Sequence, residues 1–164
     1  MAQQRHALAG PAHTGASAGE ITTCLNELVC SDPTGQTATV VVGHLDEDKV
    51  LHWADAGHPA PLLLRDGRTE PLETGQRGPL LGAPPGDAYE TSSPRVRPGD
   101  LLVLCTDGMV ERRGEDVAEG IARLARAVAA AASLQPQDAV DAPLADPEIA
   151  GHEDGACVLG IRVD

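Results

Sequence analysis

The stretch Leu101-Leu102-Val103-Leu104-Cys105-Thr106-Asp107-Gly108-Met109-Val110-Glu111 joins a short apolar run to an acid and a glycine. An apolar run of this length, entered from a Pro-Gly-Asp turn, predicts a buried strand. The strand would deliver Asp107 to the rim of the core, where Gly108 lets the backbone turn. A carboxylate in such a place could ligate a metal, but a lone Asp-Gly pair is also a common turn signal. This stretch alone leaves both interpretations open.

The composition narrows the class of protein. The chain has 164 residues and four cysteines without a Cys-x-x-Cys pair, so we expect one domain with buried, reduced thiols in the cytoplasm. No apolar run is long enough to cross a membrane, and residues 1–20 lack the apolar core of a secretion signal. The formal net charge is −13. It argues against a nucleic-acid partner, because binding a phosphate backbone needs a cationic face.

Local patterns along the chain predict mixed secondary structure. Ser17 and Glu20 match a capping box, which predicts the start of a helix that ends near Ser31. Besides the opening stretch, the expected strands are 37–45, 50–54, 62–65, 68–72, 89–96 and 157–163. The expected later helices are 115–133 and a short one that begins at Pro136 and is ended by Pro143 and Pro147. Residues 3–8 could be the end of another helix. This order predicts an α+β fold in which helices cover antiparallel sheets.

Three acids could act together. Asp107 closes one expected strand, and Glu153 and Asp154 precede the last one. If these two strands are neighbours in one sheet, the acids can converge. Ligand sets made only of oxygen suit Mg²⁺ or Mn²⁺, and two such ions could activate water and clamp a phosphoryl group. The alternative is that these residues are solvated acids at strand ends.

The histidines allow two interpretations as well. His58 lies in the segment 55–61, which we expect to be a rigid loop because prolines stand on both sides of Ala60. It could act as an acid or base, although a hydrogen bond that shapes the loop is favoured. His44 and His52 fall on the two arms of an expected hairpin, where surface or half-buried positions are favoured over metal ligation.

Taken in chain order, several short motifs resemble those of one family. They are Asp55-Ala56-Gly57-His58-Pro59, Gly78-Pro79-Leu80-Leu81-Gly82, Pro98-Gly99-Asp100-Leu101-Leu102, Thr106-Asp107-Gly108 and Glu153-Asp154. This series resembles the stage II sporulation protein E type of metal-dependent (type 2C-like, PPM) serine/threonine phosphatases. The resemblance implies a sandwich of two antiparallel sheets flanked by helices, of which this chain would form part. It also implies two Mn²⁺ or Mg²⁺ ions whose bridging water attacks phosphoserine or phosphothreonine.

The same resemblance assigns roles to individual residues. Asp107 is implied to be a metal ligand, and the second matched ligand falls on Glu153 or Asp154. The family usually has two aspartates at that pair, so Glu153 is one methylene longer, and Asp154 could substitute for it. The loops around the implied site carry Asp55, Gly57, His58, Thr106 and Gly108, with Asp55 standing where the family usually has Asn.

The family's catalytic centre also uses a Gly-Asp-x-x-Gly-His-Gly segment, which does not occur in residues 1–164. We therefore expect residues 1–164 to be a single, N-terminally truncated phosphatase domain, so that either the natural protein is longer or the chain is an inactive relative. As the first function, the resemblance implies dephosphorylation of a phosphorylated regulatory protein, an anti-sigma-factor antagonist, which would release a bacterial sigma factor. The alternative is an inactive phosphatase-like module that binds a regulatory partner. A third possibility is that this aromatic-poor chain does not fold independently.

Overall fold

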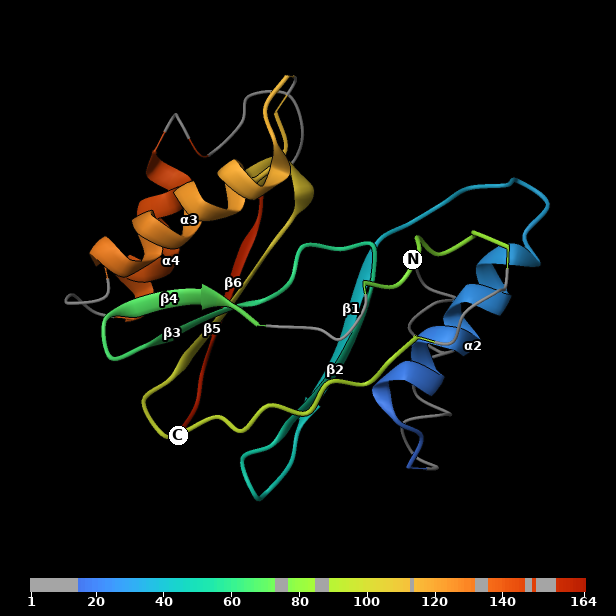
Figure 1. Ribbon diagram of the computed structural model, residues 1–164, viewed down its shortest axis with the longest axis horizontal. Helices are drawn as coiled ribbons and strands as arrows, with labels where there is room; N and C mark the ends of the chain where they lie inside the picture. Colours follow the sequence, from blue (N-terminus) through green and yellow to red (C-terminus); the bar gives the residue numbers. More distant parts are fainter. Residues whose placement is uncertain are drawn as a thin grey trace. The chain divides into compact units, whose positions relative to one another are not determined.

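The computed structural model describes residues 15–72, 77–84, 89–112, 114–131, 136–146, 149 and 156–164. The possible helix at residues 3–8 lies outside these residues. Figure 1 shows the elements, which are α2 (Ala18–Cys30), β1 (Val40–Leu45), β2 (Leu51–Ala56), β3 (Leu62–Arg65), β4 (Arg68–Pro71), β5 (Leu101–Cys105), η1 (Asp107–Met109), α3 (Val117–Ala131), α4 (Pro136–Ala145) and β6 (Val158–Arg162). The chain divides into unit 1, Met1–His58 with Glu73–Arg95, and unit 2, Pro59–Leu72 with Val96–Asp164.

Unit 1 combines helix α2 with the antiparallel hairpin β1–β2, which extends as a ladder from the pair Val40–Ala56. The predicted capping box is present. Glu20 N–H donates to Ser17 Oγ over 3.3 Å, and Ser17 N–H donates to Glu20 Oε2 over 2.8 Å. This exchange satisfies helix donors that have no partner within the helix. The buried face of α2, which includes Ile21, then packs against the hairpin.

Strand β2 is longer than predicted, and the neighbouring segment 89–96 is less regular than predicted. β2 continues through Asp55 and Ala56, which were expected in a loop, because they lie opposite Val41 and Val40 in the ladder. Residues 89–96 were expected to form a strand, and this prediction was wrong. Their backbone pairs with β2 in an isolated bridge, in which Trp53 N–H donates to the Ser92 carbonyl over 2.9 Å. Pro94 has no N–H to donate, so a regular ladder cannot continue through this segment.

Unit 2 is a four-stranded antiparallel sheet of order β4-β3-β5-β6. Figure 1 shows α3 and α4 on one side of this sheet. Alternate residues of β5, Leu101, Val103 and Cys105, join the core that these helices cover. The predicted strand at residues 62–65 has the expected bounds, and β5 occupies the apolar run on which the sequence prediction was centred.

Two further predictions need correction. Pro143 was expected, together with Pro147, to end the last helix, but it lies inside α4, which ends at Ala145. Its side chain is fully buried, so packing compensates for the backbone hydrogen bond that proline cannot make. The cysteines are free, as predicted, but only Cys105 is buried, whereas Cys24, Cys30 and Cys157 are exposed. Within the described part of the chain, no helix is long and apolar enough to cross a membrane.

Candidate functional site

Asp107 opens the short 3₁₀ turn η1, two residues after β5 ends at Cys105. The Thr106 carbonyl accepts Met109 N–H over 2.9 Å, and the Asp107 carbonyl accepts Val110 N–H over 2.9 Å. Met109 and Val110 are each 1% exposed and belong to the core of unit 2. Hydrogen bonds within the turn, and the packing of Met109 and Val110 in the core, therefore stabilise η1. It presents Asp107, which is half-buried, beyond the end of β5, an inner strand of the sheet.

The end of β5 and the start of β6 lie side by side. Thr106 N–H donates to the Cys157 carbonyl over 3.0 Å, and Cys157 N–H donates to Thr106 Oγ1 over 3.0 Å. The two strands are therefore neighbours in one sheet, which is the condition on which the predicted convergence of acids depends. Glu153 and Asp154, the other predicted ligands, lie outside the described residues. Gly108 lies within η1.

The remaining predicted site residues belong to unit 1. His58 Nδ1 lies 3.0 Å from Thr39 Oγ1, a contact that accounts for a role in shaping the loop. Gly57 has a φ of +67°, and its N–H donates to the Gly78 carbonyl over 3.0 Å. A Cβ at Gly57 would collide with the Leu80 side chain. The positive φ favours glycine here, and a larger residue would also displace the end of the exposed Leu80 side chain.

Asp55 is a buried acid at the end of β2, with only 4% of its surface exposed. Its Oδ1 has no hydrogen-bond partner among the residues that the structure describes. Burial raises the pKa of the Asp55 carboxyl, against the opposing effects of Arg77, the Gly57 N–H and His58. Desolvation disfavours the charged form of a buried acid, so Asp55 is a costly residue to keep ionised in unit 1.

The histidine pair of the hairpin forms a separate cluster. His44 and His52 face each other across β1 and β2, with ring centroids 4.9 Å apart. His52 Nε2 lies 3.0 Å from Asp46 Oδ2, and His52 Nδ1 lies 3.0 Å from Ser93 Oγ. The hydrogen bond from Val50 N–H and the contact with His52 lower the pKa of the Asp46 carboxyl. These contacts link the turn of the hairpin to β2, and they link β2 to Ser93.

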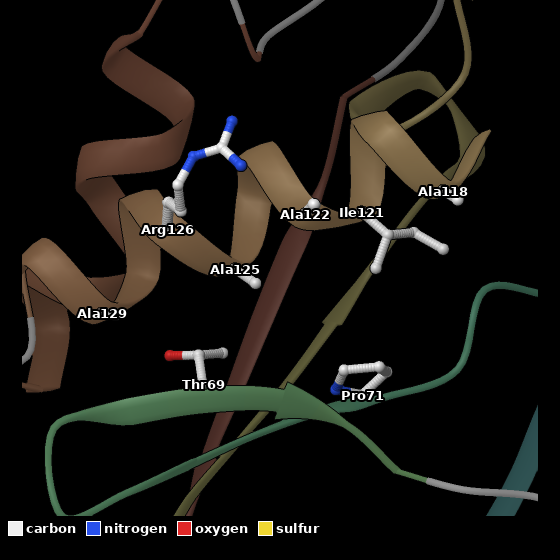
Figure 2. Close-up of a pocket in the computed structure, with 8 residues that line it drawn as sticks. All are labelled: Thr69, Pro71, Ala118, Ile121, Ala122, Ala125, Arg126 and Ala129. Atoms are coloured by element: carbon white, nitrogen blue, oxygen red, sulfur yellow. The ribbon is translucent and has the colours of Figure 1, made fainter. Parts of the chain in front are cut away.

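A groove of about 510 Å³ lies in unit 2 between α3 and β4 (Figure 2). Ala125 and Ile121 of α3 line one wall, and Thr69 and Pro71 of β4 line the other. Figure 2 shows the Arg126 guanidinium turned away from β4, so the groove is lined mainly by apolar atoms. Among the described residues, no acid lines it, so these residues offer none of the carboxylate ligands that hard cations prefer.

The family model for stage II sporulation protein E (SpoIIE) matches residues 1–164, the whole chain. The chain belongs to the SpoIIE family. The predicted relationship to SpoIIE-type PPM phosphatases is thereby confirmed.

Solved structures agree with this SpoIIE membership. The structure of the RsbU and RsbW domains of Rv1364c from Mycobacterium tuberculosis is 29% identical with a TM-score of 0.82, and the match covers 99% of this chain and 46% of that one. The PP2C phosphatase domain with a regulatory fragment of SpoIIE from Bacillus subtilis is 18% identical, with a TM-score of 0.75, over 99% and 50% of the two chains. The SiaA PP2C domain of Pseudomonas aeruginosa is 21% identical, with a TM-score of 0.73, over 98% and 66%.

These likenesses confirm the predicted fold class, with two antiparallel sheets flanked by helices. This SpoIIE-family chain spans less than two thirds of the length of each of these three solved chains.

Metal dependence is a property of the SpoIIE-type phosphatases, and Asp107 meets one of its requirements. A carboxylate is the donor that Mn²⁺ and Mg²⁺ prefer, and the turn η1 holds this one at a strand end. Among the described residues, however, no group of three or more His, Cys, Asp or Glu side chains is arranged to hold a metal ion. The donor chemistry at Asp107 therefore fits the family's cations, while the described residues alone do not complete a ligand set.

Proposed function

We propose that this chain is part of a metal-dependent serine/threonine protein phosphatase in which Asp107 is a metal ligand. The observation that supports this most is the paired hydrogen bonding of Thr106 with Cys157, because it brings the Asp107 turn beside the start of β6. Asp154 precedes Cys157 by three residues, so their Cα atoms can be no more than about 11 Å apart. We propose Asp154 or Glu153 as the second ligand.

The chemistry follows from the family. When bound, two Mn²⁺ or Mg²⁺ ions would supply an activated water and stabilise the charge of a phosphoryl group. The substrate is proposed to be phosphoserine or phosphothreonine on a regulatory protein of the anti-sigma-factor antagonist type, in the cytoplasm. The likeness to a structure of RsbU and RsbW domains supports this choice of substrate class.

The test uses the natural polypeptide that contains residues 1–164, with its activity measured as Mn²⁺-dependent phosphate release from a phosphoserine protein. Asp107→Asn should lower this release by about 100-fold or more, since loss of even an indirect contact to a ligand costs 10–100-fold in metal affinity or activity. Asp66→Asn is the matched control, because Asp66 is an exposed turn residue of the same unit with a φ of +51°. Asn also adopts that conformation. Equal phosphate release by the wild type and Asp107→Asn would contradict the proposal.

A second function, an inactive phosphatase-like module that binds a regulatory partner, is favoured by one sequence observation. Residues 1–164 contain no Gly-Asp-x-x-Gly-His-Gly segment. If the wild-type polypeptide neither binds Mn²⁺ nor releases phosphate, yet retains a phosphorylated antagonist in a pull-down, this second function replaces the first.

A further inference from the structure

Thr106 ends the β5–β6 ladder in an unusual way. Cys105 lies opposite Val158, so the next pair along the two strands is Thr106 and Cys157. In a regular hydrogen-bonded pair of antiparallel residues, each residue donates its N–H to the carbonyl of the other. Thr106 N–H does donate to the Cys157 carbonyl, over 3.0 Å. Cys157 N–H instead donates to the Thr106 side chain, at Oγ1, also over 3.0 Å.

Because Cys157 N–H donates to the Thr106 side chain, the Thr106 carbonyl is left to accept a hydrogen bond in the next turn. The Thr106 carbonyl accepts Met109 N–H over 2.9 Å, which closes η1 around Asp107. If the Thr106 carbonyl pointed at Cys157, it would favour continuation of the strand. The turn η1, however, needs the same carbonyl for its own hydrogen bond. The Thr106 hydroxyl therefore takes over the ladder contact at the point where the backbone leaves the sheet.

We propose that the Thr106 hydroxyl is a positioning group, which couples the Asp107 turn to the start of β6 and so sets where the Asp107 carboxylate stands. This inference rests on the proposed function, in which Asp107 is a metal ligand. Groups that orient metal ligands through hydrogen bonds contribute to metal affinity without touching the metal. The position requires a hydroxyl and not a threonine as such. Serine can accept the same N–H, whereas valine has the shape of threonine but no acceptor.

The test compares three variants of the natural polypeptide that contains residues 1–164. Thr106→Val removes the acceptor at nearly constant volume, and Thr106→Ser restores it. Thr69→Val is the matched control, because Thr69 lies in β4 of the same sheet and its Oγ1 is buried without a partner among the described residues. The measurements are the Mn²⁺ dissociation constant by calorimetry and the hydrogen-exchange rate of the Cys157 amide by NMR without metal.

Thr106→Val is expected to weaken Mn²⁺ binding about tenfold and to speed exchange of the Cys157 amide. Thr106→Ser should restore both quantities to the wild-type values, and Thr69→Val should change neither. If Thr106→Val does not fold, Thr106→Ala replaces it, because the smaller side chain also removes the hydroxyl.

Two outcomes separate this inference from the proposed function. If Asp107→Asn loses Mn²⁺ binding but Thr106→Val binds as tightly as the wild type, the positioning role is overturned and the proposed function stands. If Asp107→Asn binds Mn²⁺ as tightly as the wild type, the proposed function fails, and the positioning role fails with it. A loss of affinity in Thr106→Val that serine does not rescue also overturns the inference, because the cause would not be the hydroxyl.

Discussion

Arg65 and Asp100 form a two-point ion pair. Arg65 Nε donates to Asp100 Oδ1 over 2.9 Å, and Arg65 Nη2 donates to Asp100 Oδ2 over 2.5 Å. Asp100 is only 3% exposed and also accepts Arg97 N–H over 2.7 Å. The pair ties the end of β3 to the turn that enters β5. The Pro-Gly-Asp motif before β5 therefore has a structural role within unit 2.

Asp100→Asn should destabilise the chain by about 3 kcal/mol at pH 7, because it leaves a guanidinium without its charged partner. Burial raises the pKa of Asp100, but the hydrogen bonds from Arg65 and Arg97 N–H outweigh it, so the pKa lies below its usual value. The stabilisation is therefore present above the unfolded pKa of about 3.9 and is lost as the pH falls through the lower folded pKa.

Urea denaturation at pH 7 and pH 3 measures this difference, with Asp48→Asn, at an exposed acid outside the ion pair, as the control for charge alone. A wild-type advantage that is equal at both pH values would refute the assignment of the effect to the Asp100 carboxylate. Cooperative unfolding of the wild type would also show that the chain folds independently.

Asp55→Asn should have the opposite effect and stabilise the chain by about 1 kcal/mol at pH 7, because a neutral amide avoids the cost of a buried charge. The folded-state pKa of Asp55 is raised by burial. Below the unfolded pKa of about 3.9, the wild type is therefore as stable as the variant. As the pH rises through the folded pKa, the wild type becomes less stable than the variant. Denaturation in EDTA across this range tests it, with exposed Asp48→Asn as control. A gain that does not grow with pH would contradict the explanation.

The capping box of α2 gives a third prediction. Ser17→Ala should cost about 1 kcal/mol, the usual loss for an N-cap, because Glu20 N–H then loses its 3.3 Å contact with Ser17 Oγ. Ser17→Asp should retain most of the stability, because aspartate is also a favoured N-cap. Guanidinium denaturation of both variants compares them, and equal losses for alanine and aspartate would argue against a capping role.

Gly120→Ala should destabilise the chain by about 2 kcal/mol, as overpacking does, although alanine normally favours a helix over glycine by about 1 kcal/mol. A Cβ at Gly120 would overlap the Val110 carbonyl oxygen, in the segment that follows the Asp107 turn. Ala122→Gly, at an exposed site of the same helix, should lose only about 1 kcal/mol through helix propensity. Thermal unfolding compares the two, and stabilisation by Gly120→Ala would show that the close approach is absent.

The thiols should react at different rates. Burial, together with the charge of Asp107, raises the pKa of the Cys105 thiol to about 11, so little thiolate exists at pH 8. Cys24, Cys30 and Cys157 are exposed and should be alkylated first by iodoacetamide. Mass spectrometry of peptides before and after unfolding in urea measures this order. Early labelling of Cys105 in the folded protein would contradict its buried position.

The parts of the fold that depend on local chemistry were predictable from the sequence. The bounds of β3 follow from Asp66-Gly67, whose φ values of +51° and +75° match the tight turn that this pair favours. The Asp107 turn was likewise predicted, because the apolar run and the Asp-Gly pair adjoin. Residues 89–96 were mispredicted as a strand, because their β-leaning composition says nothing of how Pro94 meets β2 in space.

The contacts that define the candidate site were harder to predict. The partner of the Thr106 hydroxyl is a main-chain N–H, 51 residues away. Because nearly every residue type has this N–H, the residue at position 157 does not reveal the contact. Only the order of β5 and β6 in the sheet brings them together. The metal-binding role of Asp107 is tested by Asp107→Asn. The metal-binding roles of Glu153 and Asp154, and the loop roles of Asp55, Gly57 and His58, stay predictions.

The position of β5 in the sheet also bears on the folding of unit 2 during synthesis. Both neighbours of this strand are distant along the chain, with Leu62 opposite Val103 and Leu101 opposite Arg162. At translation rates of about 5–20 residues per second, synthesis from Cys105 to Val158 takes about 3 to 10 s. During that interval the nascent chain holds a leucine-rich strand with one open edge, which is a template for intermolecular pairing. We therefore expect the sheet of unit 2 to be completed only after β6 has been synthesised.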